Sequence, residues 1–147
     1  MNQIKPVSSL MSTHLVTISP TDNLSTVKEV FESHSFHHLP VVELNKPVGI
    51  ISRTKFFGYL MGLKHHVDQS HLDDVLLKKL TAEDIMTKRL AKVESIDTVA
   101  VAVEVFRTNL VHSILVVDKG ELVGILTTHD IISLVSKEKI NDLDYKN

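Results

Sequence analysis

The stretch Gly124-Ile-Leu-Thr-Thr-His-Asp130 is an apolar run that ends in a Thr-x-x-Asp pattern, and apolar residues resume directly after it. This order predicts a strand that turns into a helix. The first N–H groups of a helix are unpaired and carry the positive end of its dipole, so such a turn can hold an anion or a ribose hydroxyl. Thr127 and Asp130 also fit a capping box, which needs no ligand.

The same pattern occurs 75 residues earlier, as Gly49-Ile-Ile-Ser-Arg-Thr-Lys55. The ungapped match runs from Met11 to Phe57, and 12 of its 47 positions are identical. This self-similarity indicates an internal duplication. A repeat of about 50 residues buries little surface alone, so we expect two lobes that share an interface, where a ligand would bind.

Composition excludes several classes of protein. The 147 residues carry 16 Lys and Arg against 18 Asp and Glu, without a basic block, which argues against a general nucleic-acid binder. The absence of cysteine excludes disulfides and thiolate metal sites. No stretch approaches the roughly 18 apolar residues of a membrane span, and the first residues have no apolar signal core. We therefore expect a soluble cytoplasmic protein without a membrane association.

The first helix of each repeat follows an acidic residue. Asp22 is the expected N-cap, and Leu24, Val27 and Phe31 fall on one face. The equivalent stretch 99–106 alternates strictly and, taken alone, would predict a strand. Its match to the first repeat predicts a helix instead, with Val99, Ala102 and Phe106 inward and the extra valines on a second buried side. His34 and Asn109 should end these helices, Asn109 in the left-handed conformation.

Two apolar runs follow each helix and predict strands covered on both faces. They are Leu39–Val42 and Val48–Ile51 in the first repeat, and Ile114–Val117 and Leu122–Leu126 in the second. The hairpin turns between them are 43–47 and 118–121. Each repeat is therefore predicted as β-α-β-β-α, an α/β (α+β) fold.

The expected organisation has four parts: repeat 1 over residues 7–60, a helical connector over 61–79, repeat 2 over 80–135 and a C-terminal tail over 136–147. Residues 7–14 suggest a short helix or turn. In the connector region an apolar stripe at helical spacing, expected to pack against the second lobe, consists of Leu72, Val75, Leu76 and Leu80.

Three features recur in both halves: Met-Ser/Thr at the start, His-x-Leu-Pro-Val-Val or its counterpart in the middle, and Gly-Ile-hydrophobic-Ser/Thr near the end, followed in the second half by x-x-Asp. In this combination the chain resembles a tandem pair of cystathionine-β-synthase (CBS) repeats, a Bateman module. The resemblance covers residues 7–60 and 80–135. It implies two repeats packed with pseudo-twofold symmetry, as in a stand-alone CBS-domain protein.

The resemblance also implies that adenosine compounds bind in two clefts between paired repeats. The family's motif Asp takes the ribose hydroxyls, its Ser/Thr helps to hold phosphate, and the other repeat surrounds the base and phosphates. Carried onto this sequence, one cleft combines Val16, Phe36, His37, His38, Thr127, His129 and Asp130. The second combines Ser52, Arg53, Lys55, Ala91, Val111, His112 and Ser113. The expected regulatory ligand is AMP, ADP or ATP, with no metal required.

Lys55 departs from the family pattern, because it stands where the ribose-binding Asp belongs. The second cleft is therefore expected to be a weaker site or an anion site. A cation in the first helical turn opposes the dipole by roughly 0.3–1 kcal/mol, and Arg53 adds to this. A nearby anion would offset that cost. The alternative is that both side chains extend into solvent.

The nine histidines raise the question of a metal site. They include two clusters, formed by His34, His37 and His38 and by His65, His66 and His71. Structural zinc sites usually have four ligands, and only Asp68 offers a nearby carboxylate. We therefore favour a solvated linker for the second cluster, and a place in the nucleotide cleft for His37.

Two function classes remain open. One is a regulatory adenosine-nucleotide sensor that acts on a partner protein, and the other is a ligand-independent dimerisation module. NAD, S-adenosylmethionine and a cyclic dinucleotide are alternative ligands. Asp130 favours the sensor, because the assembly module gives this residue no role beyond the cap. An enzyme is not expected, because no nucleophile is paired with a base and no glycine-rich phosphate loop occurs.

A homodimer is expected as well. The resemblance implies association through helical faces, and four residues offer apolar surface beyond what one lobe pair needs. These are Phe56, Phe57, Tyr59 and Leu60.

Overall fold

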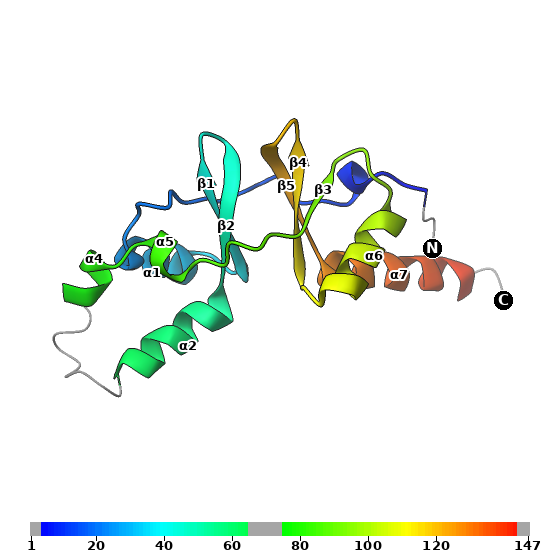
Figure 1. The fold of residues 1–147 in the computed structure, drawn as a ribbon. Coiled ribbons are helices and arrows are strands. Elements are labelled where there is room, and N and C mark those ends of the chain that lie inside the picture. Colours follow the sequence, from blue (N-terminus) through cyan, green and yellow to red (C-terminus); the bar gives the residue numbers. More distant parts are fainter. Residues whose placement is uncertain (1–3, 65–74, 144–147) are drawn as a thin grey trace. The chain divides into compact units, whose positions relative to one another are not determined.

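Figure 1 shows the fold in a computed structural model, which describes residues 4–64 and 75–143. The chain divides into two compact units. Residues 16–90 form the first, here the Lys55 unit, and residues 1–15 and 91–147 form the second, here the Asp130 unit. The Lys55 unit contains α1 (Leu24–Ser33), β1 (His38–Glu43), β2 (Lys46–Ser52), α2 (Arg53–Lys64), α4 (Leu77–Lys79) and α5 (Ala82–Ile85). The Asp130 unit contains η1 (Val7–Ser9), β3 (Lys92–Glu94), α6 (Val99–Asn109), β4 (Ser113–Asp118), β5 (Glu121–Thr127) and α7 (Thr128–Leu143).

The sheets of the two units have the same pairing. In the Asp130 unit β3 runs parallel to β4, with Val93 opposite Val116, and β4 is antiparallel to β5 (Figure 1). In the Lys55 unit β1 and β2 form the equivalent hairpin, and the first strand is reduced to one parallel bridge between Ile18 and Val41. Ile18 and Val41 each lie 75 residues before their counterparts, Val93 and Val116. The predicted β-α-β-β-α repeat is therefore confirmed.

Both hairpins close with a two-residue turn. Leu44 and Asn45 have φ values of 49° and 66°, and Lys119 and Gly120 have 50° and 81°. Positive φ at both central residues matches the twist of the flanking strands, and Asn and Gly tolerate it best. The first turn is shorter than the predicted 43–47, because β2 already begins at Lys46.

The first helix of each repeat supplies a large part of the core. Leu24, Val27 and Phe31 of α1 are fully buried, as predicted. Residues 99–109 form helix α6, so the repeat correctly overrides the alternating pattern. Val101 is 43% exposed, and the expectation of a second buried side is wrong for this valine.

The start of α1 corrects one prediction. Asn23, and not Asp22, is the N-cap, and its Oδ1 accepts a hydrogen bond of 3.0 Å from the backbone N–H of Thr26. The carboxylate of Asp22 accepts instead from the N–H of Ser19, at 2.8 Å. Asp22 therefore closes the turn that precedes the helix, and the next residue is left to cap it.

The helix ends differ from the expectation too. The left-handed residue after α6 is Leu110, with φ 52° and ψ 37°. Asn109 is still helical, and its side-chain amide donates to the carbonyl of Val105 at 2.9 Å. His34 after α1 is extended, with φ −135°. The chain thus leaves the two helices in different ways.

The segment that opens each repeat packs on the other repeat. Residues around Met11 pair with the Asp130 unit, through backbone bridges between Pro6 and Thr98 and between Ser12 and Ile125. The equivalent residues around Met86 pair with the Lys55 unit, where the bridges join Asn23 to Thr81 and Ile50 to Thr87. The boundaries of the sequence repeats therefore differ from the boundaries of the compact units.

Leu80 of the connector stripe packs against the first repeat, so the expectation that the stripe covers the second lobe is wrong for this residue. Leu77 is buried in the core of the Lys55 unit, and Leu80 packs against the same core. Val75 is 55% exposed. Leu72 lies outside the described residues.

The apolar residues expected on the surface of α2 are mostly core residues. Phe56 and Leu60 are buried, and Phe57 packs against the same cluster. Tyr59 and Met61 are exposed.

Within the described chain, no helix has both the length and the apolarity needed to cross a membrane.

Candidate ligand-binding sites

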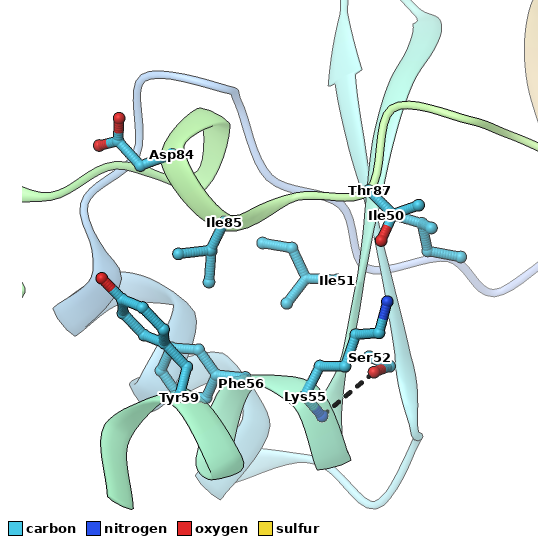
Figure 2. Close-up of a pocket in the computed structure, with 9 residues that line it drawn as sticks. All are labelled: Ile50, Ile51, Ser52, Lys55, Phe56, Tyr59, Asp84, Ile85 and Thr87. Carbon is cyan, nitrogen blue, oxygen red and sulfur yellow. Dashed lines mark hydrogen bonds between the residues drawn. The ribbon is translucent and has the colours of Figure 1, made fainter. Parts of the chain in front are cut away.

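A pocket of about 300 Å³ lies in the Lys55 unit, where β2 turns into α2. This volume is at the lower end of the range for small-molecule sites. Its lining residues are Ile50, Ile51, Ser52, Lys55, Phe56, Tyr59, Asp84, Ile85 and Thr87. Figure 2 shows Ile51, Phe56, Tyr59 and Ile85 around its apolar part, with Lys55 beside Ser52 and Asp84 at the other end. The pocket therefore combines an apolar wall with hydroxyl groups and one charge of each sign.

The first turn of α2 forms the polar side of this pocket. The Oγ of Ser52 accepts a hydrogen bond of 3.2 Å from the backbone N–H of Lys55, as an N-cap residue does (Figure 2). The Ser52 hydroxyl can still donate its proton to a ligand. Lys55 is exposed and brings a cation to the positive end of the helix dipole. These groups favour an anionic ligand over a neutral one.

Arg53 does not line the pocket. Its Nε donates to the carbonyl of Phe36 at 3.1 Å, and its Nη2 donates to the carbonyls of Phe31 and His34. The guanidinium carbon also lies 5.4 Å from the centroid of the Phe31 ring and 5.9 Å from that of Phe57. Arg53 is half-buried, so neither the anion contact nor the solvated side chain expected from the sequence describes it.

The Asp130 unit has the same strand-to-helix turn with different chemistry. The Oδ2 of Asp130 accepts from both the N–H and the hydroxyl of Thr127, each at 2.7 Å. The residues are therefore in contact, as the Thr-x-x-Asp pattern predicted. Within the described chain Oδ1 has no hydrogen-bond partner. That oxygen can accept from a ligand while Oδ2 remains in the cap.

The opening segments complete both turns. Ile50 and Thr87 exchange two backbone hydrogen bonds, of 3.1 and 2.9 Å. Ser12 and Ile125 do the same at 2.9 and 3.0 Å. Thr87 lines the pocket of the Lys55 unit, and Ser12 is its counterpart in the repeat.

Several lining residues were missed from the sequence. Asp84, Ile85 and Thr87 come from the opening segment of the second repeat, which the sequence could not assign to the first. A signal existed in the repeat itself, since Met86-Thr87 and Met11-Ser12 are equivalent. Phe56 and Tyr59 were noticed only as surface for a dimer.

The remaining predicted site residues are divided between the two units. In the Lys55 unit Val16, Phe36 and His38 are half-buried and His37 is exposed. In the Asp130 unit Ala91, Val111 and Ser113 are half-buried, and His112 and His129 are exposed. Each predicted cleft combines residues of both units, so both clefts stay predictions.

The histidines among the described residues do not gather into a metal site. The Nδ1 of His34 lies 2.9 Å from the carbonyl of Val30, and its ring lies against that of Phe36 at 5.1 Å between centroids. Among residues 4–64 and 75–143, no three His, Cys, Asp or Glu side chains gather as a metal site would require. The cluster of His65, His66 and His71 falls outside these ranges.

The fold and the repeated turn match a known family. The sequence model of the CBS domain matches residues 7–62 and again residues 82–137, which together are most of the chain. The protein therefore belongs to the CBS domain family, as the sequence motifs suggested, and it carries a tandem pair of these domains.

Similar proteins include both longer chains and isolated domain pairs. Inosine-5'-monophosphate dehydrogenase of Methanocaldococcus jannaschii is 28% identical over 131 residues, which are 88% of this chain and 23% of that protein. The chain thus spans about a quarter of this curated relative, and the enzyme activity in its name is not shown for this chain.

Two solved structures agree with the fold. The CBS domain pair of protein MJ0100, in complex with 5'-methylthioadenosine and S-adenosyl-L-methionine, has a TM-score of 0.74 and 24% identity, with 92% of this chain and 98% of that one covered. The CBS domain of a CBS domain-containing membrane protein from Sphaerobacter thermophilus also has a TM-score of 0.74, with 26% identity and 90% and 88% coverage.

Proposed function

We propose that this chain is a regulatory module that binds an adenosine nucleotide and acts on a partner protein. The ligand's ribose lies on Asp130, with Thr127 and His129 from the same turn. Val16, Phe36, His37 and His38 complete this cleft. The second cleft, with Ser52, Lys55 and the residues Ala91, Val111, His112 and Ser113, is a weaker site or takes only an anion.

The observation that carries this proposal is the geometry of Asp130. Its Oδ2 is fixed by Thr127 and its Oδ1 has no partner within the described chain, so a preset acceptor stands at the N-terminus of a long helix. A carboxylate oxygen can accept from a ribose hydroxyl, while the helix N-terminus favours phosphate. The ligands named for the MJ0100 domain pair are both adenosine compounds, which supports the same ligand class here.

A thermal-shift screen tests the ligand. The compounds are AMP, ADP, ATP, NAD, S-adenosyl-L-methionine and a cyclic dinucleotide. Binding to the native state alone stabilises it by about 2.7 kcal/mol at 100 times the dissociation constant. We expect AMP, ADP or ATP to raise the melting temperature most. An unchanged melting temperature with every compound would contradict the sensor and favour a ligand-independent assembly module.

A homodimer is part of the proposal, and α2 is its expected face. Phe56 and Leu60 are unavailable because they are buried, which leaves the exposed Tyr59 and Met61 on this helix. We expect a dimer in sedimentation, and a monomer for Met61→Lys because the change places charge in the contact. Ile132→Lys on α7, which is 62% exposed in the wild type, is the matched control and should stay dimeric. A 16.5 kDa wild-type monomer at tens of micromolar would contradict the prediction.

A cytoplasmic location also belongs to the proposal. A chain without cysteine needs no oxidising compartment, and the proposed nucleotides are metabolites of the cytoplasm. The regulated partner is a protein that binds the ligand-bound and ligand-free forms of this chain with different affinities.

A further inference from the structure

The first residue of α2 holds the end of α1. The last carbonyls of a helix have no partner within it. In α1 the guanidinium of Arg53 donates to the carbonyl of Phe31 and also to those of His34 and Phe36, which lie beyond the helix. The backbone N–H of Arg53 donates to the carbonyl of His37 at 2.8 Å. One residue therefore binds four carbonyls along the segment from Phe31 to His37.

Aromatic rings fix the side chain that makes these bonds. The guanidinium lies over the rings of Phe31 and Phe57, at 5.4 and 5.9 Å from their centroids. Phe31 is fully buried, and its ring also contacts those of Phe36 and Phe56 at 6.2 and 5.6 Å. A planar guanidinium can stack on rings while its rigid fork of N–H groups donates to several carbonyls, whereas a lysine ammonium is a compact charge that neither stacks nor offers a fixed fork.

The second repeat lacks this arrangement, although its backbone is equivalent. Thr128 stands where Arg53 stands in the first repeat, and its N–H donates to the carbonyl of His112 at 3.1 Å. The end of α6 is closed by its own residues, because Leu110 turns left-handed and its N–H donates to the carbonyl of Phe106 at 3.1 Å. Among the described residues, a distant side chain holds the chain after the helix in the first repeat and not in the second.

We infer that Arg53 is a positioning residue, which holds Phe36, His37 and His38 in the conformation that binds ligand. The inference rests on the proposed function, which places these three residues in the Asp130 cleft. It differs from the sequence expectation, because Arg53 acts through backbone carbonyls and does not itself contact the ligand. Since Ser52 and Lys55 line the pocket from the same helical turn, this turn also joins the pocket to the segment.

NMR of the ligand-free chain tests the positioning directly. In Arg53→Ala the N–H of residue 53 should exchange with solvent at least about tenfold faster, because the carbonyl of His37 is no longer held against it. The amide signals of Phe36, His37 and His38 should shift as well. Arg53→Lys keeps the charge but not the fork of donors, so it should resemble Arg53→Ala. If the amide exchange rate and the chemical shifts of Arg53→Ala equalled those of the wild-type protein, the inference would be overturned.

Two controls separate positioning from loss of stability. Val27→Ala truncates a fully buried residue of α1 and lowers the melting temperature without touching the Arg53 bonds. It should leave the exchange at residue 53 close to wild type at temperatures well below melting. Arg107→Ala removes an exposed arginine of α6, paired with Glu104, and should change neither readout. If Val27→Ala reproduced the exchange of Arg53→Ala, the effect would be general destabilisation and the inference would fail.

Calorimetry with AMP then tests the consequence for binding. Arg53→Ala should bind AMP about tenfold more weakly, which corresponds to about 1.4 kcal/mol, whereas Val27→Ala and Arg107→Ala should keep wild-type affinity. An unchanged affinity in Arg53→Ala would overturn the link to the cleft. If wild-type protein bound none of the adenosine compounds, the proposed function would fail. The exchange measurement would still decide whether Arg53 positions the segment.

Discussion

Asp130→Ala is expected to weaken adenosine-nucleotide binding at least about a hundredfold in isothermal titration. A carboxylate that accepts from ribose hydroxyls makes charge-assisted bonds, each worth about 1.5–3 kcal/mol, and about 2.7 kcal/mol is a factor of one hundred. One ligand should bind per wild-type chain, since the first repeat has a donor-only ammonium at the equivalent position. Two equivalent tight sites per chain would show that the family's site had been assigned to the wrong cleft.

Control variants separate recognition of the ribose from capping of α7. Asp130→Asn retains an oxygen that can accept from Thr127 but loses the charge, so its stability should exceed that of Asp130→Ala while its affinity stays low. Lys55→Ala should leave the binding at Asp130 unchanged. Lys55→Asp restores the family motif, and we expect it to add a second site. Unchanged affinity in Asp130→Ala would contradict the proposed role of this carboxylate.

Gly49→Ala is expected to destabilise the Lys55 unit by about 1–3 kcal/mol in urea unfolding. A Cβ at residue 49 would lie 2.3 Å from the Sδ of Met86, 2.7 Å from its Cγ and 3.0 Å from its Cβ. Rotation of the methionine can move the sulfur away, but its Cβ moves only with the backbone of the opening segment. Met86→Ala in the same chain should restore part of the loss, since it removes the two closest atoms.

Gly58→Ala is the matched control, and it is expected to raise the free energy of unfolding where Gly49→Ala lowers it. This glycine lies inside α2, and an added Cβ there has no heavy atom within 4 Å. Alanine should therefore stabilise the helix by roughly 0.5–1 kcal/mol, because glycine loses more backbone freedom on folding. If Gly49→Ala proved as stable as wild type, the close packing between the β2 strand and Met86 would not hold in solution.

The fold could be predicted because the two copies carry different local information. Residues 99–106 suggest a strand on their own, whereas Leu24, Val27 and Phe31 mark a helix at the equivalent place. The shared glycines and Val-Val pairs mark the strands of both hairpins, in which Gly49 lies opposite Val41 and Gly124 opposite Val116. The contact between Thr127 and Asp130 was also predictable, because residues three apart at a helix start commonly cap it.

The N-cap of α1, the direction of the Arg53 side chain and the pairing of the opening segments depend on tertiary contacts, which a sequence pattern does not show. Asp22 and Asn23 are both good N-caps, and the turn at Ser19 decides between them. The direction of the Arg53 side chain depends on carbonyls 17 to 22 residues away in sequence. The opening segments around Met11 and Met86 are so alike that the pattern could not show which strand each one joins.

That last arrangement has a consequence for synthesis on the ribosome. The Lys55 unit is a continuous stretch, and its last segment is complete once residue 90 has emerged. The Asp130 unit needs Val7, which is fully buried in its core, and also strands that end at Thr127. Domains generally fold as units and the N-terminal part first. The segment around Val7 and Ser12 therefore lacks its backbone partners, which lie between Ser95 and Ile125, until that later part of the chain has been synthesised.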